Sequence, residues 1–355
     1  MKFDFLLKKF TIFIAILLCL IAGKIKAQDI HFSQFYNSAL LLNPAQTGLV
    51  CNYRAGLNYR SQWSSANSPY KTFAGYFDVP IYFNKKRNTS LGLGLVIFND
   101  VAGDGKYGTL EIDPSIAFHM GLGSDDPKKY KLSIGFQPSL RQHSLNVSNL
   151  TFATQYDGWV INPTLPTNET IITRDKPFQP FFDAHTGIQF SAAPTEELNY
   201  WVGSAVFHLL TPTESFLINP SVFSKVPMRF NVNAGMRYIL NERMYILSHA
   251  LFMKQAKAKE LNFGGELDIK TSANKVDVQE FTFLMGAYYR WKDAMQLLVG
   301  GELQNLRVAL AYDVNVSKLR SATKLRGSYE LCMVYKAPCR IIPYKYKYQY
   351  ICPRF

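Results

Sequence analysis

One stretch of the chain, residues 260–269, separates into two faces when it is read with a period of two. Apolar side chains and a glycine occupy the odd-numbered positions, which we call one parity, and mostly acidic side chains occupy the even-numbered positions, the other parity. The odd positions are Leu261, Phe263, Gly265, Leu267 and Ile269, and the even positions are Glu260, Asn262, Gly264, Glu266 and Asp268. Successive side chains of a β-strand point to opposite faces, so this pattern indicates a two-faced strand. In a soluble sandwich the apolar face is the core, whereas in a transmembrane barrel it faces lipid and the polar face lines the lumen.

The same alternation recurs along most of the chain, and we interpret it as fourteen strands. The predicted ranges are residues 52–60, 70–79, 89–98, 109–120, 130–141, 178–191, 198–209, 226–239, 243–254, 259–269, 278–290, 295–303, 306–316 and 323–335. Several have the roughly 9–11 residues that a tilted membrane strand needs. An even number places both ends of a barrel on the periplasmic side. The two longest connections, residues 142–177 and 210–225, then face outside.

Composition favours a membrane barrel over a helical membrane protein or a sandwich. Aromatic residues make up 14% and charged residues 18% of the 355 residues, against a typical charged fraction of roughly 25%. The mean hydropathy is only −0.06, as expected when half of every span is polar. Charges of both signs recur on the polar parity, where they can pair across a lumen or meet water. They are Arg54, Arg60, Glu111, Asp113, Lys131, Arg141, Asp183, Arg229, Arg237, Glu260, Glu266, Asp268, Glu302, Arg307, Asp313, Lys324, Arg326 and Glu330. We therefore predict an all-β fold, a transmembrane antiparallel barrel of about fourteen strands over residues 51–335.

The N-terminus carries the only long apolar run. Three lysines precede residues 10–22, and a second basic group leads to Ala27, which is typical of a signal peptide over residues 1–27. A membrane anchor is the alternative, but the run is shorter than the roughly 20 residues of a helical span. Residues 28–50 are not strand-like, and we predict an N-terminal periplasmic segment or a plug of the barrel.

The C-terminus breaks the barrel pattern. Residues 336–355 form a basic, tyrosine-rich tail with five positive charges and no acid, out of a formal charge of +9 after removal of residues 1–27. Tyrosines alternate with polar residues, and we expect a periplasmic element that binds a partner through Tyr344, Tyr346, Tyr348, Tyr350 and Phe355. A disordered basic tail on lipid headgroups is the alternative. An exported chain with this local charge excess is not expected to bind nucleic acid.

Four cysteines remain after removal of residues 1–27: Cys51, Cys332, Cys339 and Cys352. Their spacing matches no zinc or redox motif, and export permits disulfides. Closing the barrel brings the first and last strands together. We expect a bridge from Cys51 to Cys332 or Cys339, or one between Cys339 and Cys352, with free thiols as the alternative.

An ordered series of short motifs resembles the PorP/SprF family. The motifs are Asp29-Ile30-His31-Phe32-Ser33-Gln34-Phe35-Tyr36-Asn37, Leu42-Asn43-Pro44-Ala45 with Gly48, Asn58-Tyr59-Arg60-Ser61-Gln62-Trp63, Asn99-Asp100 with Ala102-Gly103-Asp104-Gly105, and Leu150-Thr151-Phe152 with Gln155 and Asp157. The chain departs from the expected pattern at Gln46-Thr47, where an aromatic or small pair is expected. The resemblance implies an outer-membrane protein of type IX secretion and gliding motility, without catalytic residues or cofactor. It also implies two kinds of partner, a secreted surface protein of that pathway and periplasmic secretion or motility components.

Two functional hypotheses remain, and neither is an enzyme. The first is a docking accessory in the outer membrane that supports secretion or surface retention of a large protein. The second is a channel for small hydrophobic solutes, which can also use a plugged fourteen-strand barrel. Residues four apart on a strand, such as Ser204 and His208, lie about 13 Å apart and cannot form a catalytic pair.

Two local features have alternatives. Arg60 and Trp63 are candidate partner-binding residues at the barrel rim, and Trp63 alternatively is an interfacial aromatic in the outer-membrane lipid. Residues 99–105 have the oxygen ligands of a Ca²⁺ loop, but a hairpin turn explains them equally well.

Overall fold

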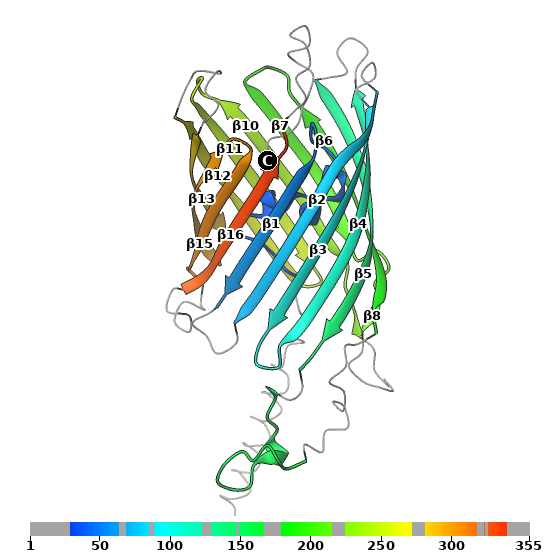
Figure 1. Cartoon of the computed structure of the whole chain (residues 1–355), viewed down its shortest axis with the longest axis vertical. Helices are drawn as coiled ribbons and strands as arrows, with labels where there is room; N and C mark the ends of the chain where they lie inside the picture. Colours follow the sequence, from blue (N-terminus) through cyan, green and yellow to red (C-terminus); the bar gives the residue numbers. More distant parts are fainter. Residues whose placement is uncertain are drawn as a thin grey trace, which may run out of the picture.

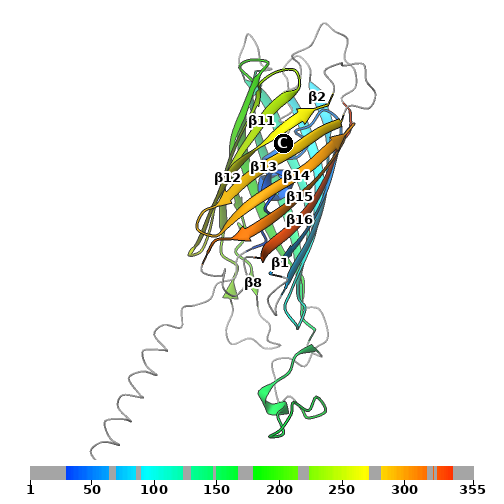
Figure 2. The same cartoon turned by 90° about the vertical axis from the view of Figure 1, so that its left-hand side faces the viewer.

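The chain forms a closed antiparallel barrel of fourteen strands (Figures 1 and 2). This computed structural model describes residues 29–63, 69–84, 89–122, 129–146, 149–166, 179–214, 224–271, 281–317, 323 and 326–338. The predicted fold class and strand number are confirmed. The predicted signal peptide at residues 1–27 lies outside the described residues. Of the predicted tail at residues 336–355, Lys336 ends the last strand and residues 339–355 lie outside the described residues.

Each barrel strand pairs with the next along the chain, and the last strand pairs with the first. The strands are β1 (Arg54–Gln62), β2 (Tyr70–Asn84), β3 (Thr89–Ala102), β4 (Tyr107–Leu122), β5 (Tyr130–Ser144), β6 (Phe181–Ala192), β7 (Leu198–Phe207), β10 (Arg229–Ile239), β11 (Met244–Gln255), β12 (Ala258–Lys270), β13 (Phe281–Arg290), β14 (Ala294–Leu303), β15 (Leu306–Asn315) and β16 (Arg326–Lys336). At the seam, β1 pairs with β16 from Arg54 opposite Lys336 to Gln62 opposite Ser328.

The barrel has its polar face inside, which distinguishes it from a soluble sandwich. On β12, Asn262, Glu266 and Asp268 are buried, while Leu261 and Phe263 are exposed. Most charged residues predicted for the polar parity are buried, and they include Arg54, Arg60, Glu111, Asp113, Lys131, Arg141, Asp183, Arg229, Glu266, Asp268, Arg307, Asp313 and Glu330. An apolar outer surface around a polar lumen is the arrangement of an outer-membrane barrel.

Several strands are longer than the alternation indicated. β3 and β5 continue to Ala102 and Ser144, beyond the predicted ends at residues 98 and 141. The predicted connection at residues 210–225 contains a small two-stranded sheet of β8 (Thr213–Glu214) and β9 (Ser224–Lys225). At these ends sheet hydrogen bonding continues past the membrane-facing apolar pattern. β10 is shorter than predicted, because it begins at Arg229 and the predicted strand began at residue 226.

The two ends of the barrel differ. We call the end that carries the connections after β1, β3, β5, β7, β11, β13 and β15 the long-loop end. The connections between β5 and β6 and between β7 and β10 both lie there. In Figure 1 it is the lower end of the barrel.

A second part of the chain lies inside the barrel. Residues 29–50, the N-terminal segment, appear in blue within the lumen (Figure 1). They include three short helices, η1 (Phe35–Asn37), α2 (Ala39–Leu42) and η2 (Pro44–Gln46); a fourth, η4 (Ala153–Gln155), lies in the connection between β5 and β6. Among the described residues, the helices are too short and insufficiently apolar to span a membrane.

We predict that the long-loop end faces the outside of the cell. In separate variants, Lys257→Cys places a thiol in the exposed β11–β12 turn at that end, and Glu242→Cys places one in the exposed β10–β11 turn at the other end. A membrane-impermeant maleimide should label position 257 in intact cells and position 242 only after the outer membrane is permeabilised. The reverse order of labelling would contradict this orientation.

Candidate functional site: the N-terminal segment in the lumen

The N-terminal segment runs through the lumen and contacts strands around most of the barrel. Nearly every side chain from Phe32 to Leu49 is buried. The segment starts near the long-loop end, where Asp29 contacts His208 after β7 and Arg229 at the start of β10, and it reaches β1 at the other end. The segment therefore occupies the lumen. The sequence had left two locations open, the periplasm and the interior of the barrel.

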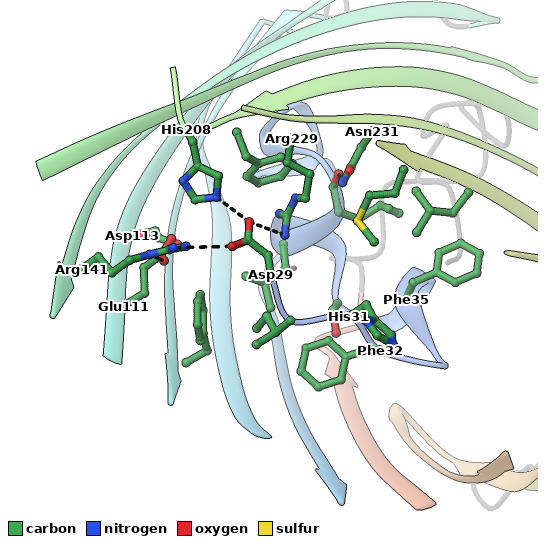
Figure 3. A pocket seen from close by; sticks show the side chains of 18 residues that line it. Asp29, His31, Phe32, Phe35, Glu111, Asp113, Arg141, His208, Arg229 and Asn231 are labelled. Atoms are coloured by element: carbon green, nitrogen blue, oxygen red, sulfur yellow. Dashed lines mark hydrogen bonds and ion pairs between the residues drawn. The ribbon is translucent and has the colours of Figure 1, made fainter. Parts of the chain in front are cut away.

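Asp29 lies at the centre of a cluster of charges (Figure 3). Its carboxylate lies 2.5 Å from Nε2 of His208, 3.2 Å from Nη1 of Arg229 and 3.5 Å from Nη1 of Arg141. Arg141 also forms an ion pair with Glu111 on the neighbouring strand β4. One carboxylate on the N-terminal segment thus balances cations that come from β5, β10 and the residue after β7.

The electrostatics of this cluster favour the charged forms. Burial by itself raises the pKa of Asp29, but His208, Arg141 and Arg229 outweigh it and hold that pKa well below its usual value. Burial by itself lowers the pKa of His208, but Asp29 and Asp183 outweigh it and raise the pKa. Asp29 and His208 therefore form a buried pair of opposite charges.

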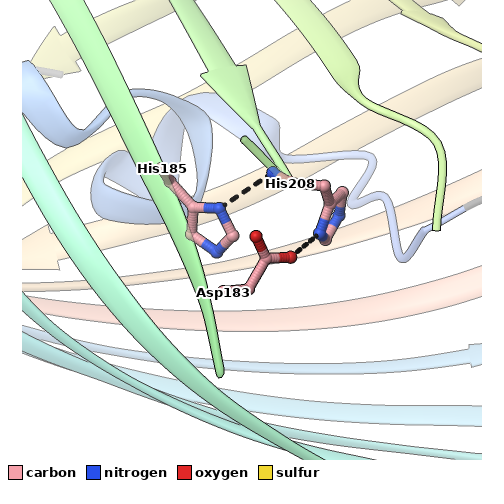
Figure 4. A group of neighbouring side chains, drawn as sticks. All are labelled: Asp183, His185 and His208. Carbon is pink, nitrogen blue, oxygen red and sulfur yellow. Dashed lines mark hydrogen bonds and ion pairs between the residues drawn. The ribbon is translucent and has the colours of Figure 1, made fainter. Parts of the chain in front are cut away.

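His208 also belongs to a group of potential metal ligands with Asp183 and His185 (Figure 4). Ligand atoms of the three residues all lie within 4.8 Å of one another, and Glu111, Asp113 and His185 form a second such group. The groups already have hydrogen-bond partners: Nδ1 of His208 lies 2.6 Å from Asp183, and Nδ1 of His185 accepts the backbone N–H of His208 at 3.1 Å. Both nitrogens of His208 contact carboxylates, which fits an imidazolium better than a metal ligand.

A small cavity adjoins the cluster. It has a volume of about 40 Å³ and is lined on one side by Asp29, Arg141 and Arg229 and on the other by apolar residues that include Phe35 and Met253. This volume holds a few water molecules.

The next contact is a clamp on the backbone of Ser33 and Gln34. Their two N–H groups donate to the two carboxylate oxygens of Glu330 on β16, at 2.6 and 2.9 Å. The Ser33 hydroxyl donates to Asp313 at 2.7 Å and accepts from Arg60 at 2.8 Å. Charge-assisted bonds of this kind are stronger than neutral ones, so the clamp ties the segment to the barrel seam.

Tyr36 extends the contact to strands β11–β13. Its ring stacks on His249 with 4.2 Å between the ring centroids, and it also stacks on Tyr288. Its hydroxyl donates to Glu266 at 3.1 Å, and Glu266 in turn accepts from Arg307. The ring of Tyr36 thus packs against other rings while its hydroxyl has a hydrogen-bond acceptor, which a buried tyrosine usually needs.

The Asn43-Pro44 step sits against glycines of the wall. Asn43 accepts the N–H of Ala45 at 2.9 Å, which caps η2, and donates to Asn233 at 3.2 Å. A Cβ at Gly187 would lie 2.0 Å from the Asn43 side chain, and one at Gly135 would lie 2.2 Å from the Pro44 backbone. Only glycine permits this close approach of the segment.

The segment ends in polar contacts. Gln46 donates to Gln189, and the Thr47 hydroxyl shares a hydrogen bond with Ser115. Both side chains are buried, so the unexpected Gln46-Thr47 pair is accommodated by polar partners on the wall. Asp78 accepts the N–H of Gly48 and forms an ion pair with Arg54 at the start of β1.

The predicted partner-binding residues have different locations. Arg60 is buried in the lumen and contacts Ser33, Asp313 and Glu330, so its assignment to an external partner is corrected: it holds the N-terminal segment. Trp63 is half-buried and packs edge-on against Tyr70, and its role toward lipid or a partner stays a prediction. Tyr344, Tyr346, Tyr348, Tyr350 and Phe355 lie outside the described residues.

The cysteines partly differ from expectation. Cys332 is a free, buried thiol that points into the lumen beside Asn58, so its predicted bridge to Cys51 is wrong. Cys332 lies opposite Asn58 within the β1–β16 pairing, four residues before the end of β16 at Lys336. Cys51 is disulfide-bonded. Its other predicted partner, Cys339, lies outside the described residues, as does Cys352.

Sequence reasoning missed the residues that receive the segment. Asp183 was predicted only as a charge on the polar face, and the roles of His185, Gly135 and Gly187 were not recognised. The signal was available in the alternation, because both glycines fall on lumen-facing parities beside polar residues. A glycine on the polar parity of a barrel strand indicates a close approach from inside.

The fold and its occupied lumen define an outer-membrane β-barrel protein. Over residues 24–335 the sequence matches a family described as type IX secretion system membrane protein PorP/SprF. The chain therefore belongs to this family. The expected localisation in the outer membrane is confirmed by that membership together with the barrel.

Solved structures with some similarity are also barrels. The toluene transporter TbuX of Ralstonia pickettii has a TM-score of 0.48 at 12% identity and covers 86% of this chain and 94% of its own. A FadL homologue of Pseudomonas aeruginosa has a TM-score of 0.46 at 12% identity, with coverages of 84% and 94%. No curated protein matches the sequence.

We predict that Asp29→Asn weakens the hold on the N-terminal segment. The change leaves His208, Arg141 and Arg229 buried without their shared counterion. Loss of a buried counterion typically costs about 3–5 kcal/mol of unfolding free energy. Urea unfolding of the purified protein should show this loss of stability. Asp104→Asn is the control, because the Asp104 carboxylate is exposed and its loss should leave the unfolding free energy nearly unchanged. Equal stability of the two variants would contradict the role of Asp29.

We also predict that Gly187→Ala displaces the Asn43-Pro44 step, because the added Cβ meets the Asn43 side chain at 2.0 Å. Overpacking of this kind costs about 1–3 kcal/mol. Hydrogen exchange measured by mass spectrometry should become faster in residues 38–47. Gly75→Ala is the matched control, since its Cβ meets only the Leu57 side chain at 3.2 Å and the Gly56 carbonyl at 3.8 Å. Unchanged exchange in Gly187→Ala would show that the segment does not depend on this seat.

Proposed function

We propose that this protein is a non-enzymatic docking accessory of type IX secretion, which supports export or surface retention of a large secreted protein. Family membership supports the pathway. The observation that carries the docking role is the occupied lumen. The N-terminal segment fills the lumen and is hydrogen-bonded along its length, and the apolar outer face of the barrel contacts lipid. A partner in water would therefore bind at one of the two ends of the barrel.

The alternative function, a channel for small hydrophobic solutes, has less support. The cavity beside Asp29 measures about 40 Å³. A cavity that holds benzene measures roughly 150 Å³. A hydrophobic solute would therefore have to displace the N-terminal segment from its ion pairs before it could pass, and such pairs are expensive to break.

On the periplasmic side, we propose that residues 339–355 form a docking element for secretion or motility components. The regular tyrosines of this tail favour contacts over solvation. The described residues just before the tail support a position at the periplasmic end of the barrel, close to the end of the N-terminal segment. The Ala337 N–H donates to the Tyr53 carbonyl at 2.9 Å, and the Asn52 side chain donates to the Pro338 carbonyl at 3.3 Å. The tail thus leaves the barrel beside the residues that follow the N-terminal segment.

The proposal predicts that deletion of the gene removes at least one large protein from the cell surface. Quantitative proteomics of the surface and medium, with and without the gene, measures this effect. Solute uptake should stay unchanged. A secretome that is unaltered by the deletion, or a selective defect in uptake of hydrophobic solutes, would contradict the proposal.

Truncation after Ala337 then tests the tail. The barrel should still insert and keep its heat-dependent gel mobility, while export of the dependent protein and capture of periplasmic components are lost. Cys51→Ser in the full chain is the control for loss of a disulfide, because Cys51 is bonded. Normal secretion by the truncated protein would contradict the role of the tail.

A further inference from the structure

The connection between β5 and β6 presents an apolar tip to solvent. Trp159 is 91% exposed, and its neighbours Tyr156, Val160 and Ile161 are 56%, 61% and 50% exposed. Figures 1 and 2 show this part of the connection beyond the long-loop end of the barrel, well separated from the strands. We call residues 152–163 the Trp159 hairpin. A contiguous exposed apolar group in a polar connection marks an interaction site.

The Trp159 hairpin is held by its own hydrogen bonds. Tyr156 and Ile161 form a β-bridge, and the carboxylate of Asp157 accepts the N–H groups of Trp159 and Val160, both at 2.9 Å. The Tyr156 hydroxyl donates to the Gly158 carbonyl at 2.8 Å, and Gly158 has a φ of +103° that favours glycine. These bonds hold the turn that presents Trp159, which lowers the entropy lost when a partner binds.

A further layer braces the base of the hairpin. The side chain of Gln155 accepts the N–H of Phe152 at 3.0 Å and donates to the carbonyl of Leu165 at 3.2 Å. Phe152, Gln155 and Asp157 are the residues that the sequence motif singled out. Their common role is to fold the hairpin, whereas the side chain of Trp159 extends from it and is 91% exposed.

The chemistry of the hairpin fits a protein pocket better than a lipid surface. Residues 149–166 contain no lysine or arginine, and Asp157 is their only charged residue. Segments that bind membranes combine apolar residues with basic ones, which this segment lacks. Tryptophan with tyrosine is the composition of a binding hot spot between proteins, in which an aromatic anchor fills a desolvated pocket.

We propose that the Trp159 hairpin is the outward docking element of this protein. Its partner is an exported protein that offers an uncharged, apolar pocket to Trp159. This inference rests on the proposed function and assigns the contact with the secreted protein to one described segment. Trp159 is the anchor, and Asp157 is a positioning residue that acts through the turn.

Substitutions in the full-length protein in living cells test the anchor. Trp159→Ser should lower the amount of the dependent protein on the cell surface by about tenfold or more, as expected for a hot-spot tryptophan. Trp159→Phe should keep a substantial part. Trp291→Ser is the matched control, because Trp291 is a tryptophan 55% exposed in the turn after β13 at the same end of the barrel. Equal surface amounts in Trp159→Ser and Trp291→Ser would overturn the proposal.

The positioning role of Asp157 has its own readout. Asp157→Ala removes the acceptor for two backbone N–H groups and should lower surface retention, while Asp157→Asn retains an acceptor oxygen and should restore it. Equal retention in the two variants would remove Asp157 from the proposal.

A photoreactive phenylalanine analogue at position 159 separates this inference from the proposed function. Irradiation of intact cells should give an adduct with an exported protein that is lost from the surface when the gene is deleted. A lipid adduct, or no adduct, overturns the hairpin contact even if the deletion alters the secretome. An adduct with an exported protein whose secretion is unaffected by the deletion supports the contact and refutes the proposed function.

Discussion

The structure depends on pairing buried charges inside a narrow lumen. The wall alone does not supply every partner: Arg141, Arg229 and His208 converge on Asp29 of the N-terminal segment, and Glu330 receives two backbone N–H groups of the same segment. An unpaired buried ion is costly. The segment therefore supplies part of the charge pairing inside the barrel. Its burial explains how a lumen lined with polar side chains is filled by protein and not by water.

The alternation of residues was sufficient for the barrel, because a period of two is maintained by the need to face lipid on one side. It placed Asp313, Arg307 and Glu330 on the lumen side and gave the strand number. Alternation was less reliable at the ends of strands. β5 continues to Ser144, beyond its predicted end at residue 141, because sheet hydrogen bonding extends past the last alternating apolar residue. The β8–β9 pair has only two residues on each strand, too few to show a period.

The candidate site was less accessible to sequence reasoning, since it depends on contacts between distant residues. Alternation assigns Arg60 to the lumen, yet no local pattern shows that Ser33 lies against it. The location of Asn43 beside Gly187 likewise requires the register of the whole barrel. The bridge predicted for Cys332 failed for a similar reason, because alternation shows the lumen-facing side of β16 but not that Cys332 pairs with Asn58.

The clamp at Ser33 and Gln34 also couples the first part of the chain to the last strand. Glu330 on β16 is separated from Ser33 by 297 positions, while Arg60 on β1 lies close to Ser33 in sequence. The clamp is therefore complete only when β16 is in place beside β1. The seam between β1 and β16 and the seating of the segment become one cooperative event. A barrel that closes without its interior in place leaves Arg60 and Glu330 without their links through Ser33, so correct closure is energetically distinguished from premature closure.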